Sequence, residues 1–368
     1  MMIWKISYLC TLMEARTTTR TWLPTLLILI AGLLLFVLNL IVGSVTIPLE
    51  DFWSALFGQP SESDPALSET LRINRTIILE YRLPQAITAL FAGIGLSISG
   101  LLMQTLFRNP LADPSILGIS SGASLGVAIV VLLTGKISGM AVSAMPGWST
   151  VGVTIAAFAG AFLVLLLILA LSSRLKSMVS LILVGIMIAY IAGSVTDVLK
   201  FFSQKEDVHT FVIWGFGSFS NVGKNQLGYL AVTTLTGTLL AFLLSKSLNL
   251  ILLGDRYAEN LGLNLRRASL LTILVSGFLM AVITAFCGPI AFIGLAVPHL
   301  ARFTYHTSNH FVLTPATAVI GMDLALLCNL IARLPGFDGN LPINSVTALI
   351  GAPIVIYVIF HRQKVLSK

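Results

Sequence analysis

The chain has 368 residues, of which 56% are hydrophobic and 10% are charged, and its mean hydropathy is +0.95. Soluble domains carry about 25% charged residues, so this composition excludes an ordinary soluble enzyme or binding domain. The net charge of +7 is better explained by membrane topology than by nucleic-acid binding, and the three cysteines lack the spacing of a metal site. We therefore expect a membrane protein that binds no nucleic acid and no metal.

A helix of roughly 20 apolar residues crosses a bilayer, and about ten segments meet this requirement. They lack the alternation of barrel strands, so we expect an all-α polytopic membrane protein with about ten transmembrane helices. The expected spans are residues 22–42, 84–106, 115–135, 149–171, 178–199, 226–245, 268–287, 289–304, 314–332 and 343–360. They form one predicted permease-like domain over residues 22–362, after a segment 1–21.

Lys and Arg gather in the cytoplasmic loops of membrane proteins. Placing the N-terminus inside puts more than half of the 22 Lys and Arg residues on the cytoplasmic side. Both termini, including segment 1–21, are therefore expected in the cytoplasm. The apolar run Trp22–Val42 is too long for a signal peptide, so we interpret it as a retained helix. Met13 is an alternative start to Met1.

The stretch RNPLADPSILGISSGASLG, residues 108–126, separates the second and third expected spans. Proline removes a backbone donor and moves the preceding residue out of the helical region, so a tight bend is expected here. Glycines at four-residue spacing share one helix face and allow a neighbouring helix to approach closely. The candidate bend and packing residues are Asn109, Pro110, Asp113, Pro114, Gly118, Gly122 and Gly126.

A second broken stretch, FCGPIAFIGLAVPHLARF, covers Phe286–Phe303 and contains Pro289 and Pro298. The spans before the two broken stretches run in opposite directions in the predicted topology. The sequence therefore indicates a weak inverted repeat, an arrangement typical of transport proteins with broken helices.

The cytoplasmic loop 246–267 is longer than a plain connector needs. Asp255 stands at a predicted N-cap, a short helix is expected over Arg256–Leu261, and Gly262 is suited to end it. We interpret this loop as a docking element for a soluble partner, with a lipid-surface helix as the alternative. Its candidate contact residues are Leu253, Gly254, Asp255, Arg256, Tyr257, Ala258, Leu261 and Gly262.

Three motifs in this order, RNPLADPSILGISSGA, LLGDRYAENLG and GPIAFIGLAVPHLAR, resemble the FecCD family. Its members are permease subunits of ABC importers for iron-siderophores, haem and cobalamin. The resemblance extends from about Arg82 to the C-terminus and includes LPINSVTALIGAP, residues 341–353.

The resemblance implies a membrane permease in the bacterial cytoplasmic (inner) membrane, working as a homodimer with two cytoplasmic ABC ATPase subunits. A periplasmic or lipid-anchored binding protein would deliver an iron chelate, either a siderophore complex or haem, with cobalamin as the alternative cargo. The loop 246–267 would couple the permease to the ATPase. The sequence lacks the G-x-x-x-x-G-K-[ST] phosphate loop, so ATP and Mg are expected on the partner and the chain is not itself an enzyme.

By the same resemblance, Arg82 and Arg333 would pair with acidic residues of the binding protein, and both are expected to be exposed in outer loops, where a guanidinium binds carboxylates. The sequence also departs from the family pattern. Gln85 stands where members commonly have a second Arg, Asn329 where they often have Asp, and residues 340–344 read NLPIN. These departures bear on which docking contacts apply.

Two alternatives rest on single side chains. Asp197 and Asp323 fall within or at the ends of expected spans, where a carboxylate is costly, and together would serve a proton-driven secondary transporter. His306 and His310 have a helix-like spacing that would suit a metal, although no carboxylate or cysteine stands beside them. A membrane enzyme that acts on lipid is a further alternative, but the sequence offers no clustered acid, base and nucleophile to support it.

Overall fold

The computed structural model describes residues 23–43, 45–48, 52–53, 65–133, 148–172, 174–175, 178–334 and 340–366. In these ranges the chain is helical and contains no strand, as the composition predicted. Seven of the helices are long and apolar enough to cross a membrane, and two shorter apolar helices cover Ile119–Leu133 and Ile343–Tyr357. The predicted segment 1–21 lies outside the described residues.

Each expected span corresponds to a helix. The first is Leu23–Ile41, and the second belongs to a continuous helical run made of α3 (Pro65–Thr76), η1 (Ile77–Arg82) and α4 (Leu83–Leu106). The remaining elements are η2 (Pro114–Leu117), α5 (Ile119–Ala128), η3 (Ile129–Leu133), α7 (Trp148–Ser172), α8 (Met178–Phe201), α9 (Lys205–Gly215), η5 (Phe219–Asn221), α10 (Lys224–Leu243), α11 (Ser245–Leu252), α12 (Asp255–Asn260), α13 (Leu265–Cys287), α14 (Ile293–Tyr305), α15 (His310–Ala332) and α16 (Ile343–Leu366).

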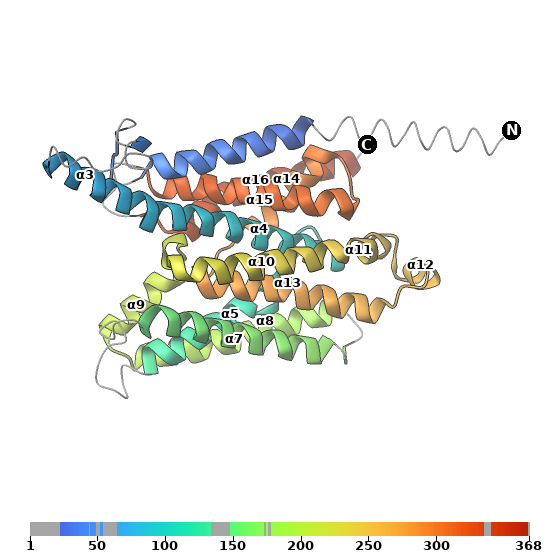
Figure 1. The fold of residues 1–368 in the computed structure, drawn as a ribbon. Coiled ribbons are helices and arrows are strands. Elements are labelled where there is room, and N and C mark those ends of the chain that lie inside the picture. The colour runs from blue at the N-terminus through green and yellow to red at the C-terminus, as the bar shows by residue number, and fades with distance from the viewer. Residues whose placement is uncertain are drawn as a thin grey trace.

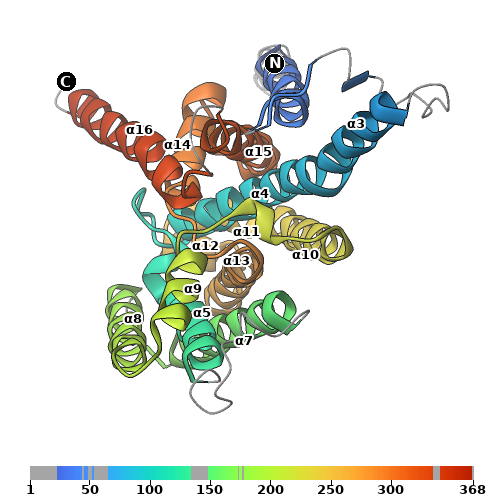
Figure 2. The same ribbon diagram turned by 90° about the vertical axis from the view of Figure 1, so that its left-hand side faces the viewer.

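Helices α4 and α13 form the centre of the bundle (Figures 1 and 2). In their apolar windows, 78% and 72% of the residues are buried, whereas the value for α8 is 22%. Helices α14, α15 and α16 lie on one side of α4, and α5, α7 and α8 lie on the other side (Figure 2). The two groups are therefore joined through a core that α4 and α13 provide.

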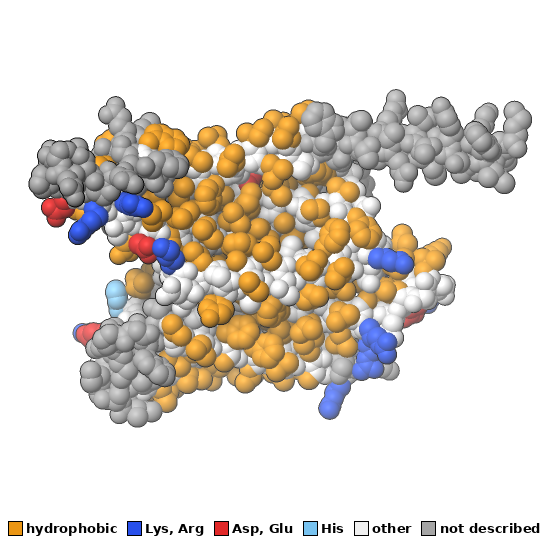
Figure 3. Space-filling view, viewed as in Figure 1, with side chains coloured by type: hydrophobic (Ala, Val, Ile, Leu, Met, Phe, Trp, Pro, Cys, Tyr) orange, Lys and Arg blue, Asp and Glu red, His pale blue; other side chains and the backbone are white. Residues whose placement is uncertain are grey.

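On the face shown in Figure 3, hydrophobic side chains cover the length of the bundle, and most of the coloured charged side chains lie toward its two ends. Large apolar side chains are also exposed along α8, among them Val179, Leu183 and Ile191. An apolar band between two charged rims is the surface that a hydrocarbon layer of about 30 Å requires. The structure thus supports the multi-pass arrangement that the hydropathy pattern predicted.

The two proline-containing stretches break the chain at opposite ends of the bundle. Helix α4 ends at Leu106, and the chain re-enters through η2 and α5. Helix α13 ends at Cys287, and α14 begins at Ile293 after two residues with positive φ, Gly288 (77°) and Phe292 (68°). Both stretches are helix–break–helix units, as expected, while the symmetry of an inverted repeat stays a prediction.

The glycines after the first break face two different helices. A Cβ added to Gly126 would lie 2.1 Å from the carbonyl oxygen of Ala156, and one added to Gly122 would lie 2.6 Å from that of Gly160, so both pack against α7. Gly118 is instead left-handed, with φ of 80°, and approaches Gly185 of α8. The single glycine face expected from the spacing is therefore divided, because Gly118 precedes the helix.

Replacing Gly126 with Leu is expected to destabilise the protein by several kcal/mol. Even the Cβ atom would overlap the backbone of α7, and backbone atoms cannot move aside by a rotamer change as a side chain can. Gly228 of α10 has nothing within 4 Å of an added Cβ and provides the matched control. Thermal unfolding of the two variants in detergent measures the difference. Equal transitions for Gly126→Leu and Gly228→Leu would contradict the close packing of α5 on α7.

Candidate functional site

The loop between α10 and α13 presents a short helix at one end of the bundle. Helix α12 projects beyond the neighbouring helices at the right of Figure 1. Its N-cap is Gly254, with φ of 107°, so Asp255 is the first helical residue and the predicted N-cap was wrong by one position. Gly262, with φ of 86°, follows the C-cap, where a left-handed residue ends many helices.

This helix exposes apolar side chains to its surroundings. Leu253, Tyr257 and Leu261 are 59%, 70% and 60% exposed, whereas Ala258 is fully buried against the bundle. Arg256 is exposed as well. Three large apolar side chains on one projecting turn form a surface suited to a protein partner. We call residues 253–262 the coupling helix region.

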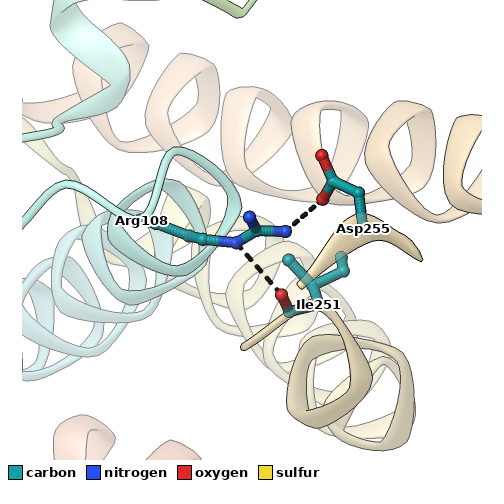
Figure 4. Close-up of polar contacts among 3 residues, drawn as sticks. All are labelled: Arg108, Ile251 and Asp255. Atoms are coloured by element: carbon teal, nitrogen blue, oxygen red, sulfur yellow. Dashed lines mark hydrogen bonds and ion pairs between the residues drawn. The ribbon is translucent and has the colours of Figure 1, made fainter. Parts of the chain in front are cut away.

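Arg108 connects the coupling helix region to the end of α4 (Figure 4). Its Nε donates a hydrogen bond of 3.1 Å to the carbonyl oxygen of Ile251, in the last turn of α11, and its Nη2 forms an ion pair with Asp255. A cation near the C-terminus of α11 and a carboxylate in the first turn of α12 both complement the helix dipoles. The two charged side chains are 40% and 59% exposed, so their contribution to stability is small and their role is to position the loop.

The turn after Arg108 is held by side-chain caps. Asn109 Oδ1 accepts from the backbone N–H of Leu111 at 3.0 Å, and Asp113 Oδ1 accepts from that of Ser115 at 2.9 Å, at the start of η2. His299 of α14 contacts the carbonyl oxygen of Pro110 at 2.9 Å through Nε2. The bend predicted from Pro110 and Pro114 is therefore rigid and is fixed to α14, the helix that contains Pro298.

Helix α11 is also bound to the start of α15. Asn249 donates to Asn309 Oδ1 at 2.8 Å, and its own Oδ1 accepts from the backbone N–H of His310. His310 Nε2 lies 2.8 Å from Thr105 Oγ1 of α4. The expected helix-like pairing of His306 and His310 was wrong, because α14 ends at Tyr305 and α15 begins at His310. The described residues contain no group of three or more potential metal ligands.

A groove with polar groups lies along α8. It has a volume of about 610 Å³ and is lined by α8 from Ile182 to Asp197 together with the start of η2. Four of its side chains are polar: Ser115, Tyr190, Ser194 and Asp197. Polar groups at membrane depth usually face water or protein, which distinguishes this face of α8 from a lipid-facing one.

The two outer arginines are buried, which corrects the exposure expected for them. Arg82 is 1% exposed and Arg333 is 6% exposed. Arg82 donates to the carbonyl oxygens of Leu40 (2.9 Å) and Ile41 (2.5 Å), at the end of the first helix, and also to that of Val45. Both guanidiniums lie against Gly43. Carbonyl groups at the end of the first helix and just after it therefore accept hydrogen bonds from Arg82, a side chain that we expected to be exposed in an outer loop.

Arg82 and Arg333 also line an outer cavity of about 560 Å³, together with Glu80, Gln85 and other residues. Burial, and after it the charge of Arg82, lower the pKa of Arg333 to about 10, so that this side chain keeps its charge at neutral pH. The cavity wall is thus cationic although little of either side chain reaches the surface.

Replacing Arg82 with Ala is expected to destabilise the protein by about 2–3 kcal/mol, because hydrogen bonds from a charged donor are lost and buried carbonyls lose their partner. An exposed docking residue would have no such effect. Arg75 of α3 is exposed and provides the control. Thermal unfolding of Arg82→Ala and Arg75→Ala tests this, and a transition of Arg82→Ala at the wild-type temperature would contradict the capping role.

Gln85 and Asn329, two of the three departures from the family pattern, contact each other. Gln85 Nε2 donates to Asn329 Oδ1 at 3.0 Å, and Asn329 Nδ2 donates to Asn39 Oδ1 at 2.8 Å. Asn39 in turn donates to the carbonyl oxygens of Leu35 and Leu326. Gln85 is 7% exposed, and Asn39 and Asn329 are fully buried. The change at Gln85 therefore alters a buried amide network that joins the first helix, α4 and α15, rather than an open docking surface.

Asp197 and Asp323 lie on opposite sides of α4, on α8 and α15 respectively (Figure 2). Asp197 forms an exposed pair with Lys200 at 3.0 Å, and Asp323 lies beside Gly32 of the first helix. Two carboxylates separated by the core of the bundle do not form a direct relay.

The fold and these sites define a polytopic, all-helical membrane protein with a short helix that projects at one end of the bundle and a polar groove along α8. The FecCD transport family matches residues 28–361. The chain therefore belongs to the FecCD transport family, whose members are permease subunits of ABC transporters in the inner membrane. Such permeases work with ATPase subunits and substrate-binding proteins.

Three similar proteins illustrate the relationship. The vitamin B12 import system permease BtuC of Klebsiella pneumoniae is 36% identical over 78% of this chain and 83% of its own. The hemin transport system permease HmuU of Yersinia pestis is 32% identical over 96% of this chain and 99% of its own. A solved ABC transporter assigned to the metal-chelate type, in an inward-facing conformation, matches with a TM-score of 0.75 and 29% identity over 91% of this chain and 97% of its own.

Proposed function

We propose that this chain is the permease subunit of an ATP-driven importer for iron chelates, with haem or a ferric siderophore as cargo. The observation that carries the proposal is the coupling helix region, a projecting apolar turn held by an ion pair to the central helix α4. Both the similarity to a hemin permease over nearly the whole chain and the similarity to a transporter of metal-chelate type support this cargo class.

The transporter would contain two copies of this chain, two cytoplasmic ATPases and a periplasmic or lipid-anchored binding protein, with both termini of the permease in the cytoplasm. Each copy would contribute the groove along α8 to a shared path. The polar groups Tyr190, Ser194 and Asp197 suit the passage of a hydrated chelate better than contact with lipid. ATP and Mg would be bound by the partner ATPase.

In this mechanism, closure of the ATPases would move the coupling helix region, and Arg108 would transmit the movement to α4. The link from Asn249 to His310 would carry the same movement to α15. The capped turn at Asn109–Pro114 would act as a rigid pivot, and the broken stretch with Pro289 would serve as its counterpart at the outer end. The cargo path would thus open alternately to the two sides.

The binding protein would dock at the outer end, over the cavity that Arg82 and Arg333 line. Carbonyl groups of the first helix already accept hydrogen bonds from Arg82. Arg82 and Arg333 would therefore attract the binding protein by their charge, and would contact it directly only after the segment around Gly43 moves aside. A carboxylate entering the cavity would find two buried cations there.

Reconstitution in liposomes with the ATPase and binding protein encoded beside this chain tests the proposal. ATP hydrolysis is measured while haemin, a ferric siderophore and cobalamin are offered in turn. Stimulation by haemin or the siderophore supports the proposal. Stimulation by cobalamin alone would favour the second candidate, to which the 36% identity with a vitamin B12 permease points. Uptake that follows a proton gradient without ATP would contradict both.

A further inference from the structure

A cavity of about 370 Å³ lies at the cytoplasmic end of the bundle, between the end of α4, α11 and the last turns of α14. It lies away from the groove along α8, and neither transport of cargo nor docking of the ATPase assigns it a role. Six of its lining residues are polar: Gln104, Thr105, Arg108, His299, Arg302 and Ser308. Its volume is at the lower end of the range for small-ligand sites, roughly 300–1,000 Å³.

The charge of this cavity is positive. Arg108 and Arg302 line it, and none of its lining residues is acidic. Guanidinium groups bind phosphate oxygens through paired N–H donors, and such charge-assisted hydrogen bonds are roughly twice as strong as neutral ones. The hydroxyl group of Ser308 adds a further donor at the same wall, whereas that of Thr105 already bonds to His310 Nε2. The lining therefore suits a small, highly charged anion.

Buried neighbours hold Arg302 in place. Gln104, which is 3% exposed, donates through Nε2 to the carbonyl oxygen of Leu295 at 3.1 Å. This bond fixes the amide so that its Oε1 accepts from Arg302 Nη1 at 2.7 Å. His299, which lines the same cavity, contacts the Pro110 carbonyl oxygen at 2.9 Å. A cation oriented before the ligand arrives loses less side-chain entropy on binding.

We propose that this cavity binds a phosphate group, held by Arg302 and Arg108. The group belongs either to the headgroup of an anionic phospholipid or to free inorganic phosphate, since both offer the same oxygens. Zwitterionic headgroups carry a compensating ammonium, so they bind less tightly to a site made of cations.

Arg108 is shared between this cavity and the ion pair with Asp255. A phosphate in the cavity competes with Asp255 for the guanidinium, because each offers oxygen acceptors to the same donors. Occupation of the cavity therefore loosens the contact between α4 and the coupling helix region. This consequence rests on the proposed function, whereas binding of the phosphate group does not.

The first experiment measures binding of inorganic phosphate to the full chain, purified in a non-ionic detergent and freed of lipid, by isothermal titration calorimetry. Arg302→Gln is expected to raise the dissociation constant about tenfold or more. Arg267→Gln removes the same charge from an exposed position at the start of α13 and is expected to leave the constant unchanged. Arg302→Lys keeps the positive charge but lacks the paired N–H donors of the guanidinium, so it is expected to weaken phosphate binding several-fold. This variant provides the test if Arg302→Gln fails to fold.

The second experiment distinguishes the sources. The chain is placed in nanodiscs of phosphatidylglycerol or of phosphatidylcholine, and native mass spectrometry counts the lipids that stay bound. If phosphatidylglycerol stays bound and Arg302→Lys reduces its retention, the ligand is the lipid headgroup, whether or not free phosphate also binds. Binding of free phosphate alone identifies the soluble anion. Absence of both, or equal losses in the Arg302 variants and Arg267→Gln, overturns the proposal. Neither readout requires ATP hydrolysis or transport, so failure of the importer function would not be confused with failure of this site.

Discussion

Replacing Asn329 with Asp is expected to destabilise the protein by about 3–5 kcal/mol, the usual cost of an uncompensated buried charge. Asn329 is fully buried, and its Nδ2 donates to Asn39 Oδ1 at 2.8 Å. Asn39 already donates its own N–H groups to two backbone carbonyls. A carboxylate oxygen at position 329 would therefore lie against Asn39 Oδ1, and neither oxygen could donate a hydrogen bond to the other. Thermal and denaturant unfolding in detergent measure the loss.

The second substitution, Gln85→Arg, gives this prediction its test. Gln85 contacts Asn329 directly, so Gln85→Arg alone buries a cation, whereas both changes together place an Arg and an Asp in contact, whose charges neutralise each other. The double variant is expected to regain at least about half of the stability that Asn329→Asp loses, as a double-mutant cycle of coupled residues shows. Asn221→Asp, at the exposed last residue of η5, is the control. Additive losses in the double variant would show that the two positions are independent.

The architecture could be predicted from the sequence because it rests on local physics. Twenty apolar residues make a span whatever surrounds them, and the prolines at 110, 114 and 289 remove backbone donors wherever they stand. Each expected span accordingly contains a helix, and the breaks lie next to Pro110, Pro114 and Pro289, whereas Pro298 lies inside α14. The coupling helix was displaced by one residue, because Gly254 offers a left-handed N-cap and leaves Asp255 to pair with Arg108.

The candidate sites were harder to predict because their contacts join distant parts of the chain. Gln85 and Asn329 are 244 positions apart, and Arg108 and Asp255 are 147 apart. The sequence showed Gln85 and Asn329 as two separate departures, and only their joint change from charged to amide residues was a signal of contact. From the sequence, Arg108 counts only as one of the positive charges that indicate the cytoplasmic side, because its neighbours in the chain do not indicate which distant residue its long side chain contacts.

The outer arginines show why exposure is difficult to infer from position. Arg82 directly precedes one apolar run and Arg333 directly follows another, so a loop location was reasonable. The structure extends the helical run through α3 and η1, which places Arg82 inside a helix. The carbonyl groups at the end of the first helix then accept from it, which is a helix-capping role for a cation. Loop folding over a charge is a tertiary event that hydropathy does not report.

Charge reversal at Arg108 is expected to uncouple the transporter with little loss of stability. Arg108→Asp would place two carboxylates at the contact with Asp255, and like charges would separate α4 from the coupling helix region. We expect cargo-stimulated ATP hydrolysis and uptake to fall about tenfold or more, which corresponds to ~1.4 kcal/mol of coupling. Because both side chains are partly exposed, the free energy of unfolding should change by less than about 1 kcal/mol.

The exchanged pair, Arg108→Asp with Asp255→Arg, is expected to recover most of the coupling, since it restores an ion pair at the same place. Lys246→Glu makes the same charge change on the exposed side of α11 and should leave coupling intact. Liposomes containing the complete complex allow hydrolysis and uptake to be measured on one sample. If the exchanged pair is as defective as Arg108→Asp, then Arg108 acts through the Ile251 carbonyl or the neighbouring cavity, and the ion pair does not transmit the movement.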